Sequence, residues 1–271
     1  MKNNSISKER LLYVKKQKTN KMLVLALRIS ILAIFILSWE VLARLNIIDA
    51  FLMSMPSKII LTIKDLFLTG ELLTHISTTL LETVLGFLIA TVLGTLIALI
   101  LWWSEFLRKV LEPYIVVLNS LPKIALGPVI IVWFGSGQKA IIAMAVLISV
   151  IVCLMTMLGG FLSTDKDKIL LLKSFGANKM QIMLKLVIPS NLPTFVNMLK
   201  IALGMSWIGS IMGEYLVSKA GLGYLIVYGS QVFKLDLVMA STFVLLALSG
   251  IWYALIALLE RFLITYKTDS N

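Results

Sequence analysis

The sequence is short of charged residues, cysteine and histidine, and each shortage excludes a class of protein. Only 14% of its 271 residues are charged and 59% are hydrophobic, which excludes an ordinary soluble domain and predicts an integral membrane protein. The single cysteine, Cys153, lies in an apolar run and excludes an intrachain disulfide and a cysteine-based metal cluster. The single histidine, His75, is expected to be a surface or packing residue, so we predict no metal site.

The sequence also lacks the motifs of ATP binding and of hydrolytic catalysis. It has no Gly-x4-Gly-Lys-Ser/Thr phosphate loop, and residues 135–139 and 221–223 lack the spacing of phosphate and dinucleotide loops. One histidine, in a segment expected outside the membrane, supplies no Ser/His/Asp set. We therefore predict a protein that is not an enzyme and has no cofactor of its own.

Positive charge exceeds negative charge, with 25 Lys and Arg against 14 Asp and Glu and a formal net charge of +11. The excess flanks apolar stretches and has no interleaved aromatic residues, so membrane orientation explains it better than nucleic-acid binding. The expected partner of this charge is the lipid bilayer, and we predict no nucleic-acid partner.

Six apolar stretches are each long enough for the ~20 residues that cross a bilayer core. They are residues 24–43, 81–102, 113–134, 141–162, 192–217 and 237–263. We predict an all-α membrane protein in which residues 1–23 form a basic cytoplasmic tail and residues 24–265 form a six-span domain. The first stretch is too long for a signal peptide and no cleavage site follows it, so we expect it to be retained. A short amphipathic helix, residues 57–68, is expected outside the membrane.

The distribution of Lys and Arg orients these spans. Sixteen lie in the segments at one end of the six spans, including the two termini and residues 164–189, against six at the other end. By the positive-inside rule the richer side is cytoplasmic. We therefore predict a multi-pass protein of the cell membrane, inner or plasma, with both termini in the cytoplasm.

Residues 164–189 form a polar, basic island between the fourth and fifth stretches. Thr164 with Asp167, and Asn178 with Gln181, have the spacing of capping boxes, which satisfy the first N–H groups of a helix. The pattern predicts two short helices, and it favours an element that docks on another protein. An ordinary connecting loop is the alternative.

Gly176 lies between the two capping patterns, and a glycine there suits the left-handed turn that closes a helix. Pro189 ends the island. We predict that the two short helices meet at Gly176 and that Pro189 stops the second one.

The third stretch carries three prolines and a lysine. Pro113, Pro122 and Pro128 remove helix hydrogen bonds, and the freed carbonyls must be satisfied by neighbours or by water in a cavity. This favours a place along a transport path. Ionisable residues within the fifth stretch are also path candidates, although snorkelling to an interface is the alternative. The candidate path-lining residues are Pro122, Lys123, Pro128, Lys200 and Glu214.

These motifs resemble those of a known family. Gly176, nine residues, and then Leu186-Val187-Ile188-Pro189 are similar to the Gly-x9-Ile-x-Leu-Pro core of the EAA loop in permease subunits of ATP-binding-cassette (ABC) importers. The Glu-Ala-Ala half is absent. Further matches resemble the nitrate, taurine and sulfonate branch of that family, and the likeness covers residues 55–265. These matches are Gly70-Glu71-Leu72, His75-Ile76, Thr79-Leu80, Gly86-Phe87, Leu121-Pro122-Lys123, Ala125-Leu126, Pro128, Trp133-Phe134-Gly135-Ser136-Gly137, and Glu214 with Gly221-Leu222-Gly223-Tyr224-Leu225-Ile226.

The resemblance implies a fold, a function and partners. The fold is that of type I (MetI-like) importer permeases with six transmembrane helices. The solute is small and anionic or heteroaromatic, such as nitrate, sulfonates, taurine or thiamine precursors. The implied partners are a cytoplasmic ABC ATPase, an extracytoplasmic binding protein and a second permease copy, forming a homodimer. The implied ATPase-coupling residues are Leu170, Leu171, Leu172, Gly176, Ala177, Leu186, Ile188 and Pro189.

Two other functions stay open at this point. A secondary transporter driven by an ion gradient usually shows inverted repeats with broken helices in both halves, whereas this sequence has one strongly broken stretch. A membrane scaffold or intramembrane enzyme is the other alternative. For an enzyme, Lys200 and Glu214 are about 21 Å apart along a helix axis, which is too far for a catalytic dyad.

The charge count generates a topology prediction. Cysteines placed at Ser163 and at Lys219, in a Cys153→Ala background, should react with a membrane-impermeant thiol reagent from opposite sides of the membrane. Labelling of both positions from the same side contradicts the six-span topology.

Overall fold

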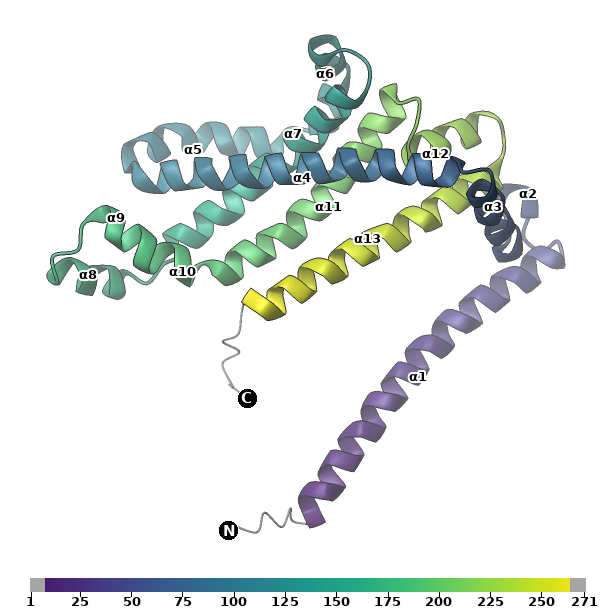
Figure 1. Cartoon of the computed structure of the whole chain (residues 1–271), viewed down its shortest axis with the longest axis horizontal. Coiled ribbons are helices and arrows are strands. Elements are labelled where there is room, and N and C mark those ends of the chain that lie inside the picture. The colour runs from purple at the N-terminus through teal and green to yellow at the C-terminus, as the bar shows by residue number, and fades with distance from the viewer. Residues whose placement is uncertain (1–7, 264–271) are drawn as a thin grey trace. The chain divides into compact units, whose positions relative to one another are not determined.

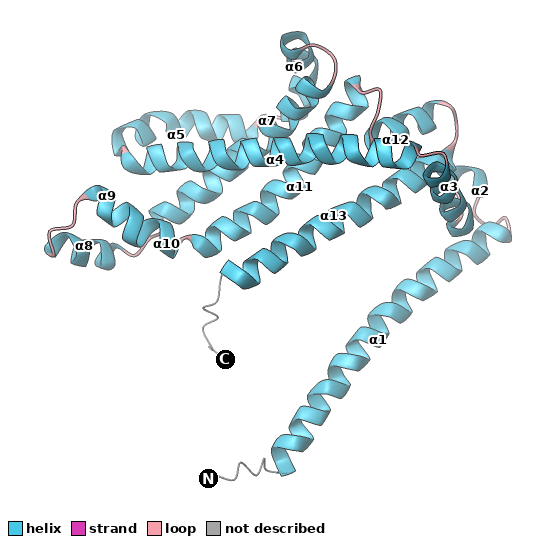
Figure 2. Cartoon of the chain, viewed as in Figure 1, coloured by secondary structure: helices cyan, strands magenta, loops and turns pink. Residues whose placement is uncertain are grey.

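The computed structural model describes residues 8–263, and its described elements are helices without any strand (Figure 2). This confirms the all-α prediction. The chain divides into two compact units, residues 1–62 and 63–271. Residues 1–7 of the predicted tail and residues 264–265 of the predicted domain lie outside the described part.

The first unit is dominated by helix α1, Lys8–Arg44, which extends well before the predicted span at residues 24–43. Most of its apolar side chains between Met22 and Leu37 are exposed, as expected of a helix that faces lipid or another protein. Helix α2, Ala50–Met53, begins where the Asp49 side chain accepts a hydrogen bond from the Phe51 N–H at 2.8 Å. Helix α3, Pro56–Leu68, starts in this unit and confirms the predicted amphipathic helix.

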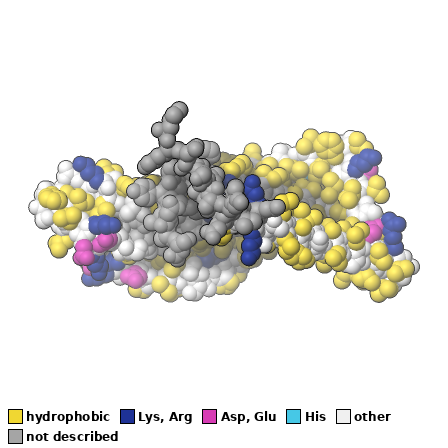
Figure 3. Space-filling model, turned by 90° about the horizontal axis from the view of Figure 1, so that it is seen from below, with side chains coloured by type: hydrophobic (Ala, Val, Ile, Leu, Met, Phe, Trp, Pro, Cys, Tyr) yellow, Lys and Arg dark blue, Asp and Glu magenta, His cyan; other side chains and the backbone are white. Residues whose placement is uncertain are grey.

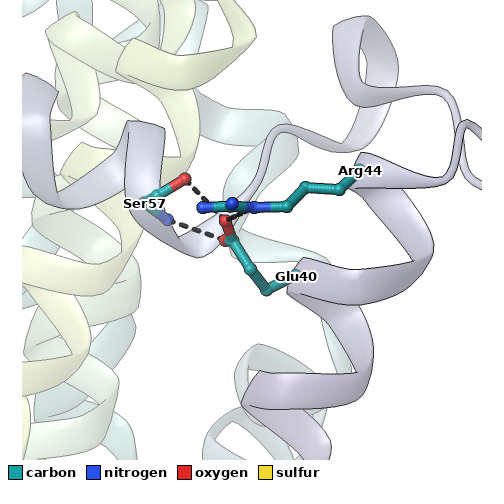
Figure 4. A network of polar contacts seen from close by, with 3 residues as sticks. All are labelled: Glu40, Arg44 and Ser57. Carbon is teal, nitrogen blue, oxygen red and sulfur yellow. Dashed lines mark hydrogen bonds and ion pairs between the residues drawn. The ribbon is translucent and has the colours of Figure 1, made fainter.

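A polar contact joins the end of α1 to the start of α3 (Figure 4). Glu40 Oε1 accepts hydrogen bonds from Arg44 Nε at 2.7 Å and from the Ser57 hydroxyl at 2.8 Å, while its Oε2 accepts from the Ser57 N–H at 3.0 Å. The carboxylate therefore satisfies an unpaired N–H group in the first turn of α3, as a capping residue does. It fixes the connection between these two helices.

The second unit is built around helices α4, Glu71–Trp103, α7, Gln138–Leu162, and α11, Leu192–Val217, which pack side by side (Figure 1). Helix α4 begins ten residues before residue 81, where the second span was predicted to begin. Polar residues fill the first turns of α4, and hydroxyls there, such as that of Thr78 on the Thr74 carbonyl at 2.9 Å, bond to backbone within the helix. This segment is therefore helical despite its mixed composition.

Small residues allow the three central helices to approach closely. An added Cβ at Gly86 on α4 or at Gly209 on α11 would overlap Ala145 on α7, and Cys153 lies against Gly94. Cys153 is fully buried in this packing. Close approach through small residues is typical of helix packing in membranes.

The third apolar stretch, predicted as one span at residues 113–134, is sharply bent. Helix α5, Glu105–Ser120, begins earlier because the Ser104 hydroxyl accepts from the Leu107 N–H at 3.2 Å. Pro113 lies inside α5. The break comes at residues 121–122, before a short 3-10 helix, Lys123–Leu126, and helix α6, Gly127–Phe134; the axes before and after it differ by 88°.

Helix α12, Leu222–Gln231, and helix α13, Leu235–Leu263, complete the unit and pack against each other and against α11. Within the described residues, five helices are long and apolar enough to cross a membrane, or up to six if the bent pair counts as one span. Hydrophobic side chains cover large areas of the face in Figure 3, whereas charged side chains gather in a few clusters. A surface of this kind fits contact with a bilayer.

The close packing of α7 and α11 generates a stability prediction. Gly209→Val should destabilise the protein by about 1–3 kcal/mol, because the new side chain collides with the backbone of α7. Gly204→Val on the same helix is the matched control, since no atom lies within 4 Å of a Cβ there. Thermal unfolding of the purified variants measures the difference, and equal melting temperatures contradict the packing described.

Candidate functional site

The predicted docking element forms a compact set of short helices between α7 and α11. Helix α8, Lys166–Ser174, is followed by helix α9, Lys179–Ile182, a π-helical turn, Met183–Val187, and helix α10, Ile188–Ser190. Figure 1 shows these helices at the end of the second unit where α7 leads into α8 and α10 leads into α11.

The first predicted capping box is wrong and the second is confirmed. Asp165, not Thr164, caps α8 by accepting from the Asp167 N–H at 2.9 Å, because Thr164 turns inward. At α9, Asn178 Oδ1 accepts from the Gln181 N–H at 2.8 Å, and Gln181 Oε1 accepts from the Asn178 N–H at 2.9 Å.

Gly176 closes α8 in the left-handed conformation, with φ of 79°, as predicted. Its N–H bonds to the Lys173 carbonyl at 2.9 Å, and the Ala177 N–H bonds to the Leu172 carbonyl at 3.0 Å. This pair of bonds is the Schellman motif of helix ends. No atom lies within 4 Å of a Cβ built on Gly176, so its backbone conformation alone restricts the residue.

Pro189 does not stop the second short helix, contrary to the prediction. The helix widens into the π-helical turn and continues to Ser190, with Pro189 in the first turn of α10. Proline is tolerated in a first turn because its missing N–H needs no partner there. The helix is interrupted at Asn191 instead, where the backbone forms a turn.

The buried side chain of Asn191 joins the two ends of the docking element. Its Nδ2 donates to the Thr164 hydroxyl at 3.0 Å and to the Val187 carbonyl at 2.9 Å. Asn191 is 5% exposed and Thr164 is 8% exposed. A Cβ at Gly160 of α7 would lie 2.7 Å from Asn191 Oδ1, so only glycine leaves room for this amide. The entry and exit of the element are therefore held together.

A second tie connects α9 to the end of α4. Lys179 Nζ donates to the Trp103 carbonyl at 2.5 Å and lies 5.3 Å and 5.8 Å from the ring centroids of Trp103 and Trp102. A cation at a helix C-terminus is favoured by the helix dipole, and aromatic faces also attract it.

The eight predicted coupling residues divide between surface and interior. Leu170 and Leu171 are 67% and 54% exposed, whereas Leu172 and Ala177 pack against the core. Gly176 and Pro189 are exposed, while Leu186 and Ile188 are half-buried. Phe175, which the sequence interpretation did not single out, is 77% exposed beside them. Leu170, Leu171 and Phe175 together make an exposed apolar group, the docking patch.

The path candidates of the third stretch surround its bend. Lys123 Nζ donates to the Asn119 carbonyl at 3.0 Å, which is a backbone group freed where α5 ends. Pro122 precedes the 3-10 helix and Pro128 lies in the first turn of α6. The structure places the three residues together at one bend, and their role along a path stays a prediction.

Lys200, a path candidate of α11, is paired with a carboxylate of α13. Its Nζ lies 2.7 Å from Glu260 Oε2 and 6.0 Å from the centroid of the Tyr253 ring. The pair neutralises the charge of Lys200 and connects the two helices, so in this structure the lysine has a partner within the chain.

Glu214, the other candidate of α11, is buried at the start of α12. The first four N–H groups of a helix lack partners within the helix. Here Glu214 Oε2 accepts from the Gly223 N–H at 2.5 Å and from the Tyr224 N–H at 3.3 Å. Glu214 is 1% exposed. Its predicted place along a path stays a prediction.

Helix α4 satisfies the neighbouring N–H groups. The Thr79 hydroxyl accepts from the Leu222 N–H at 2.8 Å, and His75 Nδ1 accepts from the Gly221 N–H at 2.9 Å. The His75 ring also stacks on Tyr224, with centroids 6.0 Å apart. Thr79, His75 and Glu214 form the α12 cap, which brings together the motifs around residues 75–80 and 214–226. His75 was predicted to be a surface or packing residue, and its stacking on Tyr224 agrees with the second of these.

Comparison with known proteins agrees with this geometry. Residues 90–265 match the family described as the binding-protein-dependent transport system inner membrane component. A probable ABC transporter permease protein of Haemophilus influenzae is 31% identical, and the match covers 86% of this chain and 95% of the relative. A formylaminopyrimidine transport permease of Halalkalibacterium halodurans is also 31% identical, over 84% and 91% of the two chains. The taurine permease of Escherichia coli is 25% identical, over 79% and 80%.

Solved structures show the same fold. A chain of the inward-facing MetNI methionine ABC transporter has a TM-score of 0.66 at 19% identity, and the match covers 72% of this chain and 97% of that one. A chain of an amino acid ABC transporter has a TM-score of 0.55 at 20% identity, covering 74% and 96%. The predicted MetI-type fold is confirmed. With a family match across most of its second unit, this chain belongs to the inner membrane components of binding-protein-dependent transport systems.

Proposed function

We propose that this chain forms the translocation path of an ABC importer and receives the force of ATP hydrolysis through residues 164–189. The observation that carries the proposal is the docking element itself. Two short helices meet at a fixed left-handed glycine, Gly176, and present the docking patch to a partner. The partner is a cytoplasmic ABC ATPase, and residues 164–189 face the cytoplasm with both chain termini.

The ties of the docking element explain how force reaches the spans. Asn191 holds its entry to its exit, and Lys179 holds α9 to the end of α4. A displacement of the docking patch therefore moves the adjacent ends of α4, α7 and α11 together. An ordinary connecting loop has no need of two ties and a buried amide.

The names of the relatives indicate the class of solute. Relatives of this chain are named as permeases for aliphatic sulfonates, formylaminopyrimidine, taurine and riboflavin. We propose a small anionic or heteroaromatic solute, delivered by an extracytoplasmic binding protein to a path enclosed by two copies of the chain.

A secondary transporter is the alternative. If the chain belongs to an ATP-driven importer as proposed, uptake into proteoliposomes that hold the assembled transporter must depend on internal ATP and not on an ion gradient.

Gly176 provides the sharpest test of the docking element. Gly176→Val should leave membrane levels normal but weaken ATPase binding and abolish most transport, because a β-branched residue at this φ costs about 1–3 kcal/mol of local strain and re-aims the docking patch. Gly176→Asn is the matched control, since asparagine tolerates the left-handed conformation.

The measurement is co-purification with the ATPase together with uptake in the same cells. The valine variant should lose both, and the asparagine variant should keep most of both. A valine variant that binds its ATPase and transports at the normal rate removes the basis for the coupling role.

Lys123 tests the path at the bend of the third stretch. Lys123→Met keeps the length of the side chain but removes its charge and its bond to the Asn119 carbonyl, so uptake should fall at least several-fold while ATPase co-purification stays normal. Lys123→Arg, which retains a donor and the charge, should restore part of the uptake. Normal uptake by the methionine variant shows that Lys123 only caps α5.

A further inference from the structure

A buried carboxyl group on α4 has no role in the coupling mechanism. Glu82 lies three residues after Thr79, is 0% exposed, and neither of its oxygens has a hydrogen-bond donor among the described residues. Oxygen Oε1 of Glu214 is also buried without a donor. Burial of an ionised carboxylate without a hydrogen-bond donor is strongly unfavourable inside a helix bundle.

Both carboxyl groups lie behind the α12 cap, where α4 and α11 are in contact. The Thr83 hydroxyl, next to Glu82, bonds to the hydroxyl of Ser210, one turn before Glu214, at 2.6 Å, and Thr79, one turn before Glu82, bonds to the start of α12. This places the two carboxyl groups close to each other. Two carboxylates only accept hydrogen bonds, so neither satisfies the other, and their like charges repel in a buried site. One proton resolves both difficulties. An O–H group on Glu82 then donates to Glu214 Oε1 and leaves a single negative charge on the pair.

The surroundings decide which residue holds the proton. Glu214 Oε2 already accepts two backbone N–H groups at the start of α12, a position that favours a negative charge. Glu82 has no such donor. The proton therefore belongs on Glu82 and the charge on Glu214.

No neighbouring charged group in the described part of the chain supplies a positive charge or a hydrogen-bond donor that could take the place of this proton. On α4, His75 accepts from Gly221 through Nδ1, so that nitrogen carries no proton, and Glu71 is exposed. Tyr215 follows Glu214 on α11 and is exposed, as is Lys219 in the following loop. No ion pair found among the described residues joins any of them to Glu82.

A polar cavity of about 340 Å³ lies beside Glu82. Its lining includes Glu82, Thr78, Ser136, Gln138, Ser218 and Lys219. A cavity of this size and polarity holds several water molecules. A proton that leaves Glu82 passes to water or hydroxide there, and the electron pair of the O–H bond stays on the carboxylate.

We propose that Glu82 and Glu214 form a proton-binding site in which one shared proton joins α4 to α11 behind the α12 cap. Loss of the proton places two negative charges side by side and pushes the two helices apart. The contact that holds α12 is then weakened as the pH rises. This inference is independent of the solute and of the ATPase partner.

Infrared spectroscopy of the full-length chain in lipid nanodiscs tests the site without any transport. At neutral pH the wild-type protein should show the C=O stretch of a buried protonated carboxyl, with a small shift in heavy water. Glu82→Gln should lose this band completely, and Glu71→Gln on the same helix should keep it. The proposal is overturned if the wild type has no such band or if the band persists in Glu82→Gln.

The pH dependence of unfolding gives a second measurement. The wild type should lose thermal stability as the pH is raised through the alkaline range, whereas Glu82→Gln, whose amide donates to Glu214 at every pH, should lose much less. Should the glutamine variant not fold, the wild-type band must disappear over the same alkaline range in which stability falls. Equal alkaline losses in both proteins, or a band that survives while stability falls, contradict a shared proton.

Discussion

Backbone groups at helix ends have no water to bond inside a membrane, and this constraint shapes the second unit. A spanning protein must satisfy them internally or in a cavity. Three side chains of the α12 cap accept hydrogen bonds from four N–H groups. Lys123 donates to the Asn119 carbonyl at the bend, and Asn191 donates to the Val187 carbonyl where the chain turns into α11. At these three interruptions a polar side chain thus satisfies the backbone groups that the helix leaves unpaired.

Internal hydrogen bonds also make the docking element stiff. Its helices are too short to be stable alone, since isolated helices of fewer than ~12 residues are marginal in water. The Schellman motif at Gly176, the capping box at Asn178 and the amide of Asn191 replace the missing helical bonds. A rigid short element can pass on a displacement that a flexible loop would absorb, which connects its hydrogen bonds to the coupling role proposed for it.

Local sequence patterns predicted the helices and turns well, but they could not predict contacts between segments that are distant in the sequence. The capping box at Asn178 and the turn at Gly176 depend on residues within four positions, so spacing alone identified them. Thr164 has the same spacing, yet its hydroxyl bonds to an amide 27 residues away, which no local pattern records. Glu82 was overlooked for the same reason, because its partner lies on another helix. The one available signal was a carboxylate inside an apolar run, at residues 80–84.

Helix α11 links the two polar centres of the unit. Asn191 stands at its foot in the docking element, and Glu214 stands 23 residues later in the α12 cap, about 35 Å away along the axis. Between them the helix is unbroken, and its Gly209 and Gly213 lie directly against α7. A tilt imposed at Asn191 is therefore expected to move Glu214 as part of the same rod. Helix α12 is held by Glu214 of α11 together with Thr79 and His75 of α4. A tilt of α11 relative to α4 must therefore strain the α12 cap first. The cap is then the place where movement of the docking element reaches the far end of the bundle.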